Sequence, residues 1–164
     1  MQLWEFLWST WIGKIVMTLL ISMVPVLELR GAIPIATAAG LNFWAAIGIA
    51  VIGNLIPVPF IILFIKKIFA LLRRMNPKFD GLVTRLEKRA EKKSATVQRY
   101  AFWGLFVLVA IPLPGTGAWT GALVAAMLEM PLKKAFPAIA LGVLGAAAIV
   151  SFVTYGAGSL IAGA

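Results

Sequence analysis

The sequence predicts an all-α integral membrane protein: an inverted-topology repeat with two opposed re-entrant (broken) helical hairpins, two full transmembrane helices and interfacial amphipathic helices. Hydrophobic residues make up 62% of the chain and charged residues 13%, whereas soluble domains carry about 25% charged residues. The apolar residues gather in long stretches without charge, and proline, glycine or an isolated charge pair interrupts them. The basic residues gather between these stretches. We therefore expect a single membrane domain over residues 1–164 that crosses the bilayer several times.

The charge-free stretches have unequal lengths. Three of them, 31–65, 100–128 and 135–164, are longer than the about 20 residues that a spanning helix needs. The fourth, 15–27, is too short to cross the bilayer alone. We interpret this short stretch as the first arm of a hairpin that enters the membrane and turns back.

The first repeat is expected over residues 1–67. It begins with tryptophans at helical spacing, which predict a short helix in the headgroup layer; they are Trp4, Trp8 and Trp11. Two apolar half-helices follow around a polar break at 28–31, which is typical of a re-entrant hairpin. A full span over 43–65 is expected to kink at Pro57 and Pro59.

The second repeat is expected over residues 99–164, after a basic cytoplasmic linker over 68–98. In the linker, apolar residues recur every three or four positions and predict an amphipathic helix from about residue 80 to 98. They are Phe79, Leu82, Val83, Leu86, Ala90 and Val97. The stretch 100–128 is broken at 111–117, and a last span starts near Ala135.

The placement of the basic residues predicts the orientation. Eleven of the fifteen Lys and Arg residues fall between Lys66 and Arg99, and two more are Lys133 and Lys134. Basic residues collect on cytoplasmic flanks, so 66–99 and 133–134 are expected on the cytoplasmic side of a prokaryotic inner membrane. The first full span ends at a basic segment and the second begins at one, so the halves are expected to cross in opposite directions.

The composition also limits which molecules the protein can bind and which reactions it can catalyse. Dense basic segments attract anionic lipid headgroups, whereas binding to nucleic acid is not expected, because few aromatic residues stand between the charges. Histidine and cysteine are both absent, which excludes disulfides, thiol chemistry and His-based catalysis. We expect no enzyme activity, no cofactor and no metal site.

The first break carries opposite charges inside an apolar region. Glu28 lies 14 residues after Lys14, which is about 21 Å of helix, so Glu28 and Arg30 are expected deep in the membrane. Each charge costs roughly 2.5–3.5 kcal/mol there, and intramembrane charges are by default functional. The alternative is an internal ion pair that fixes the hairpin tip.

The second break, 111–117, carries no charge but two prolines and two glycines. A helix that resumes near Ala118 directs free N–H groups and its positive dipole end at the break, which favours an anion. The alternative is a simple proline kink. Asn54, inside the first span, is expected either to line a pocket or to contact a neighbouring helix. Glu129 is expected to form a rim ion pair with Lys133.

These observations define a candidate set for substrate binding and transport. Its members are Glu28, Arg30, Gly31, Pro34, Asn54, Pro112, Pro114, Gly115, Thr116, Gly117, Trp119 and Thr120.

The runs Glu28-Leu29-Arg30-Gly31-Ala32-Ile33-Pro34 and Ile111-Pro112-Leu113-Pro114-Gly115-Thr116-Gly117-Ala118-Trp119-Thr120-Gly121 resemble the small multidrug export protein family. More distantly, the layout resembles the DedA superfamily of membrane proteins. That resemblance implies two opposed re-entrant hairpins and ion-driven translocation of polyprenyl phosphate carrier lipids, such as undecaprenyl phosphate. It also implies that Glu28 corresponds to an acidic residue on the first hairpin. Where the second hairpin of that superfamily carries arginines after its proline, this chain has Gly117.

Three functions are therefore open. The leading hypothesis is a secondary transporter that moves a phosphate-bearing carrier lipid with proton or ion coupling. The alternatives are a proton-coupled exporter of small cationic drugs, with a lipophilic small molecule as substrate, and a non-transporting membrane scaffold. Because each chain supplies only two full spans, a closed pathway is expected to need a homodimer.

Overall fold

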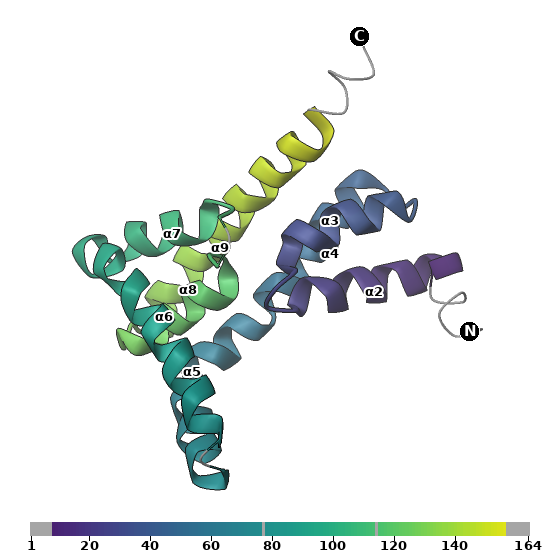
Figure 1. Cartoon of the computed structure of the whole chain (residues 1–164). Coiled ribbons are helices and arrows are strands. Elements are labelled where there is room, and N and C mark those ends of the chain that lie inside the picture. The colour runs from purple at the N-terminus through teal and green to yellow at the C-terminus, as the bar shows by residue number, and fades with distance from the viewer. Residues whose placement is uncertain (1–7, 77, 114, 157–164) are drawn as a thin grey trace. The chain divides into compact units, whose positions relative to one another are not determined.

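The structure is a computed structural model that describes residues 8–76, 78–113 and 115–156 (Figure 1). Within these ranges the chain is all-helical and contains no strand. The helices are α2 (Trp11–Met23), α3 (Glu28–Ala38), α4 (Phe43–Leu55), α5 (Pro57–Met75), α6 (Lys78–Tyr100), α7 (Phe102–Ala110), α8 (Ala118–Met127), α9 (Leu132–Ser151) and the π-helix η1 (Phe152–Gly156).

Two segments are long and apolar enough to cross a membrane. One is α4 with α5, over Phe43–Met75, and the other is α9 with η1, over Leu132–Gly156. The prediction of two full transmembrane helices is confirmed at this level. The helix is interrupted at Ile56, directly before Pro57, whereas α5 continues through Pro59.

The chain divides into two compact units. The first unit comprises Met1–Ile56 and Val143–Ala164, and the second comprises Pro57–Gly142. Each unit contains one pair of short helices that follow each other in the chain: α2 and α3 in the first, α7 and α8 in the second.

In the first unit, α2 and α3 form a helical hairpin, and α4 packs against both (Figure 1). The Oγ1 atom of Thr10 accepts from the N–H of Gly13 at 3.2 Å and caps the start of α2. The hairpin closes at its base, because a Cβ atom on Gly40 would lie 3.5 Å from the Nζ atom of Lys14. Asn42 caps α4, where its Oδ1 atom accepts from the N–H of Trp44 at 3.0 Å.

Glycines allow close helix contacts in both units. A Cβ atom on Gly53 of α4 would collide with Ser22 Oγ and would lie 2.7 Å from the carbonyl oxygen of Leu19, both in α2. In the second unit, a Cβ atom on Gly142 of α9 would lie 2.9 Å from the carbonyl oxygen of Phe106 and 2.6 Å from Val109, both in α7. Each span therefore touches the first arm of a hairpin through a glycine, as small residues do in membrane helix packing.

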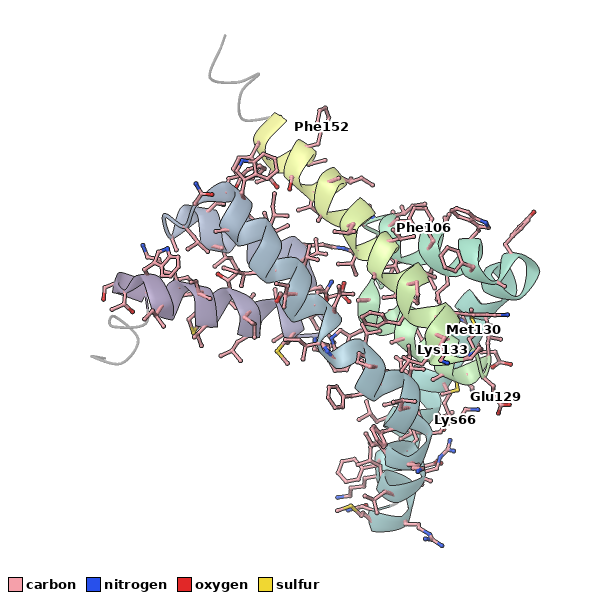
Figure 2. All side chains as sticks on the ribbon, turned by 180° about the vertical axis from the view of Figure 1, so that it is seen from behind. Lys66, Phe106, Glu129, Met130, Lys133 and Phe152 are labelled. Carbon is pink, nitrogen blue, oxygen red and sulfur yellow. The ribbon has the colours of Figure 1, made fainter. Side chains whose placement is uncertain are left out.

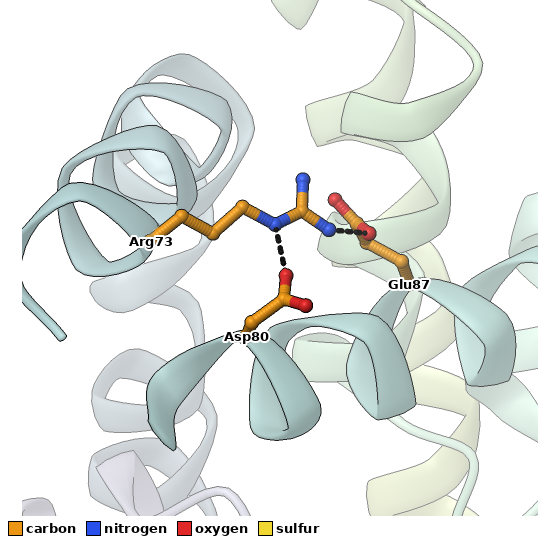
Figure 3. Close-up of polar contacts among 3 residues, drawn as sticks. All are labelled: Arg73, Asp80 and Glu87. Atoms are coloured by element: carbon orange, nitrogen blue, oxygen red, sulfur yellow. Dashed lines mark hydrogen bonds and ion pairs between the residues drawn. The ribbon is translucent and has the colours of Figure 1, made fainter. Parts of the chain in front are cut away.

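The linker helix α6 packs against α5, α7 and α8. It spans Lys78–Tyr100, slightly longer than predicted. Of its predicted apolar face, Val83 and Ala90 are buried, but Phe79 and Leu82 are exposed. Arg73 of α5 binds Asp80 at 2.9 Å and Glu87 at 2.7 Å, which ties α6 to α5 (Figure 3).

Two further predictions concern single residues. Glu129 pairs with Lys66 at 2.8 Å (Figure 2), so the predicted rim pair with Lys133 is wrong. The spacing of four residues misled the prediction because Glu129 does not lie in a helix: it has a φ of 53° in the link between α8 and α9. The predicted interfacial helix falls mostly outside the described residues, which include Trp8 and Trp11 but not Trp4.

Candidate functional site

Four polar residues of the first unit lie around the hairpin turn and at the end of α4. The hairpin turns between Met23 and Glu28, so Ser22 ends its first arm and Glu28 begins its second. Helix α4 packs against both arms, and Gly53, the neighbour of Asn54 near its end, contacts Ser22. We call Ser22, Glu28, Arg30 and Asn54 the tip cluster.

The tip cluster is buried to different degrees. Ser22 is 0% exposed, Asn54 1% and Glu28 4%, whereas Arg30 is only half-buried. Burial of an ionised carboxylate is costly unless a charge or hydrogen bonds compensate. Arg30 supplies a charge, because the two side chains interact electrostatically. The two charges are therefore close enough to influence each other.

The backbone at Glu28 is unusual. Glu28 has a φ of 48°, in the left-handed region that non-glycine residues seldom occupy. Such a conformation costs of order 1–2 kcal/mol for an L-residue. Burial of the carboxylate and strain of the backbone both lower the stability of the fold. Residues of this kind cluster at functional sites.

The first unit also buries hydroxyl and amide groups, at Thr18, Ser22 and Asn54. Thr18 Oγ1 donates to the carbonyl oxygen of Lys14 at 2.6 Å, and Ser22 Oγ donates to that of Leu19 at 2.8 Å. The Oδ1 atom of Asn54 is buried and has no hydrogen-bond partner among the described residues. A buried acceptor without a donor is rare, so Asn54 is suited to receive a donor from a ligand or a protonated group.

The length of the helices gives the depth of the tip cluster. Asn54 lies 12 residues after Asn42 at the base, which corresponds to about 18 Å of helix. Half of the hydrocarbon core is about 15 Å thick. With the base of the hairpin at the membrane surface, the tip cluster lies near the midplane.

The second break is organised by Thr116. Its side chain is buried, and its Oγ1 atom lies 2.8 Å from the carbonyl oxygens of both Ile111 and Leu113 and accepts from the N–H of Leu113 at 3.1 Å. Gly115 and Gly117 have φ angles of 77° and 133°, which require glycine. The hydroxyl of Thr116 thus serves the fold of the break.

The other predicted residues of the second break have separate surroundings. Thr120 Oγ1 donates to the carbonyl oxygen of Gly115 at 3.1 Å. Trp119 lines an apolar groove of about 560 Å³ along α5, together with Phe60 and Phe64. Pro112 lies in the break itself, and Pro114 falls outside the described residues. The prediction that both breaks line one cavity concerns the two units together and stays a prediction.

Of the remaining predicted residues, Gly31 and Pro34 lie on α3. A Cβ atom on Gly31 would lie 3.1 Å from that of Leu27 in the hairpin turn. Pro34 lacks an N–H and cannot donate to the carbonyl oxygen of Arg30. The sequence analysis missed Ser22 and Thr18, which lie as single polar residues inside the apolar run 15–27.

No group of three or more His, Cys, Asp and Glu side chains within the described residues is placed to hold a metal ion.

The all-helical fold, two span-length helices and a charged tip cluster are the features of a helical membrane protein. The chain belongs to the family described as "Putative small multi-drug export protein", whose sequence profile matches residues 28–149. The matched region begins at Glu28 and contains the whole second break. No curated protein and no solved structure matches the chain.

Proposed function

We propose that the protein is a secondary transporter whose tip cluster binds the phosphate of a carrier lipid at Arg30 and exchanges a proton at Glu28. The observation that carries the proposal is the difference in burial within the pair. Glu28 is 4% exposed and Arg30 is half-buried, so an incoming ligand meets the cation first. Arginine binds phosphate through two parallel hydrogen bonds.

The pair also provides a coupling step between the ligand and a proton. While Arg30 lies near Glu28, its positive charge favours the ionised carboxylate. A phosphate that engages Arg30 adds negative charge beside Glu28, and burial then favours the protonated carboxyl. Binding of the anion and uptake of a proton are thereby linked.

The glycine contacts support an inverted repeat around this site. Gly53 meets Leu19 and Ser22, and Gly142 meets Phe106 and Val109. In each case a glycine of a span-length segment meets two residues three apart on the first arm of a hairpin. We propose on this basis that the α2–α3 and α7–α8 hairpins are equivalent and re-entrant, as in transporters that bind substrate near the midplane.

A second candidate substrate is a small lipophilic cation, which the family description favours. In that case Glu28 binds the cation and the proton in turn, and Arg30 moves away from the carboxylate. Two further features remain part of the proposal: a homodimer, because one chain supplies two span-length segments, and a cytoplasmic position for 66–99 and 133–134.

Ligand-dependent thermal stabilisation distinguishes the candidates. We expect undecaprenyl phosphate to raise the melting temperature of the wild type, with less effect on Arg30→Lys and none on Arg30→Ala. Glu28→Gln should keep the stabilisation but lose its dependence on pH. Glu91→Gln and Arg74→Lys, at exposed positions, are the matched controls and should behave like the wild type.

Other outcomes overturn the assignment. Stabilisation by a lipophilic cation alone, lost in Glu28→Gln, would favour the drug exporter. A scaffold predicts that the variants at Glu28 and Arg30 lose stability while neither ligand has any effect on the wild type.

A further inference from the structure

The exposed side of α6 carries a cationic hollow that is separate from the tip cluster. Its volume is about 500 Å³, and it is lined by Gly81, Thr84, Arg85, Lys88, Arg89 and Lys92. The four cations recur at three- and four-residue spacing and so lie on one face of the helix. The opposite face, with Val83 and Ala90, is buried.

The acidic residues of the same helix are directed elsewhere. Arg73 of α5 binds both Asp80 and Glu87. Glu87 and Glu91 line a different hollow, together with Met127 and Leu128. Among the described ion pairs, none involves a cation of the hollow. The basic and acidic residues of α6 therefore lie on different sides of the helix, and Arg73 holds Asp80 and Glu87 away from the hollow.

A neighbouring apolar residue identifies the kind of ligand. Leu82 lies one turn before Arg85 and is 51% exposed. Exposed apolar side chains beside a cationic face are typical of a helix in a lipid interface, whereas a site for a soluble phosphate needs none. From this arrangement we infer that the hollow on α6 binds the phosphate headgroup of an anionic phospholipid, with Leu82 against its acyl region.

The test uses the purified full-length chain in a neutral detergent and a tail-labelled phosphatidylglycerol, with binding followed by fluorescence anisotropy. Each Lys or Arg near an anionic surface contributes about 1 kcal/mol, which is about fivefold in affinity. Lys88→Gln/Arg89→Gln should therefore bind about thirtyfold more weakly, and Lys92→Gln about fivefold more weakly. The charge-conserving Lys88→Arg/Arg89→Lys should bind like the wild type and reports on folding.

The matched control is Lys133→Gln/Lys134→Gln, which removes the same charge outside the hollow. We expect it to change the affinity by less than threefold. An equal loss in both double variants would show a general charge effect and overturn the site. Equal binding of labelled phosphatidylcholine, or full competition by inorganic phosphate, would overturn the lipid assignment, as would tighter binding of an RNA oligonucleotide.

Discussion

Replacement of Gly53 by alanine tests the closest helix contact of the first unit. A Cβ atom there would collide with Ser22 Oγ and would lie 2.7 Å from the carbonyl oxygen of Leu19. Alanine favours a helix interior over glycine by about 1 kcal/mol, but overpacking costs about 1–3 kcal/mol. Because the carbonyl oxygen of Leu19 belongs to the backbone and cannot rotate away, we take the upper value. Gly53→Ala should therefore be destabilised by about 2 kcal/mol.

Gly48 supplies the control on the same helix. A Cβ atom on Gly48 would have no neighbour within 4 Å, so Gly48→Ala should be neutral or more stable by up to about 1 kcal/mol. Unfolding in mixed micelles with increasing SDS measures both variants. Ser22→Ala in the Gly53→Ala background should restore part of the loss, because Oγ is removed and the Leu19 carbonyl remains. Equal stability of Gly53→Ala and Gly48→Ala would refute the close contact of α2 and α4.

Three further predictions concern the second unit and the topology. Thr116→Val should destabilise the second break by about 1–3 kcal/mol, because the buried hydroxyl that bonds the backbone of Ile111 and Leu113 is lost. Thr116→Ser should be as stable as the wild type, and the same SDS titration measures both variants. The hydrogen bond from Lys66 lowers the pKa of Glu129, so its stabilising effect is present above the ordinary glutamate pKa and is lost as the pH falls through the lowered value. Melting curves of wild type and Glu129→Gln should therefore differ at neutral pH and converge in acid; a constant difference would contradict the pair. A single cysteine that replaces the exposed Lys92 should be protected from an impermeant thiol reagent added outside the cell. A single cysteine that replaces the exposed Asn42 should be labelled by the same reagent. The reverse result would exclude the proposed orientation.

The helices and their breaks could be predicted because local signals determine them. Charge-free runs of sufficient length give the spans, and the prolines and glycines at 111–117 interrupt the helices between α7 and α8 as predicted. The predicted break at 28–31 is wrong by a few residues, because α2 already ends at Met23, before Pro25, and Glu28 begins α3. The linker helix was predicted from the regular spacing of its apolar residues. Phe79 and Leu82 are exposed, however, so this spacing alone does not determine which apolar residues are buried.

Contacts between distant segments could not be predicted in this way. Lys66 and Glu129 are 63 residues apart, and only the packed second unit brings them together. The same holds for Ser22, whose place beside Gly53 depends on the return of the chain through α4. The role of Thr116 was missed for another reason. Its hydroxyl forms hydrogen bonds within its own loop, as threonines in turns do. From the sequence alone, a threonine with this role cannot be distinguished from one that contacts a ligand.

The most direct test of the tip cluster is transport into proteoliposomes that contain the purified protein. With an imposed pH gradient, we expect uptake of a short-chain polyprenyl phosphate by the wild type and loss of uptake in Arg30→Ala. Glu28→Gln should still bind the lipid and exchange it across the membrane, but the gradient should no longer drive accumulation, because the buried carboxyl that takes up the proton is gone. Gradient-driven accumulation that is equal in the wild type and Glu28→Gln would contradict the assignment of Glu28 as the coupling residue.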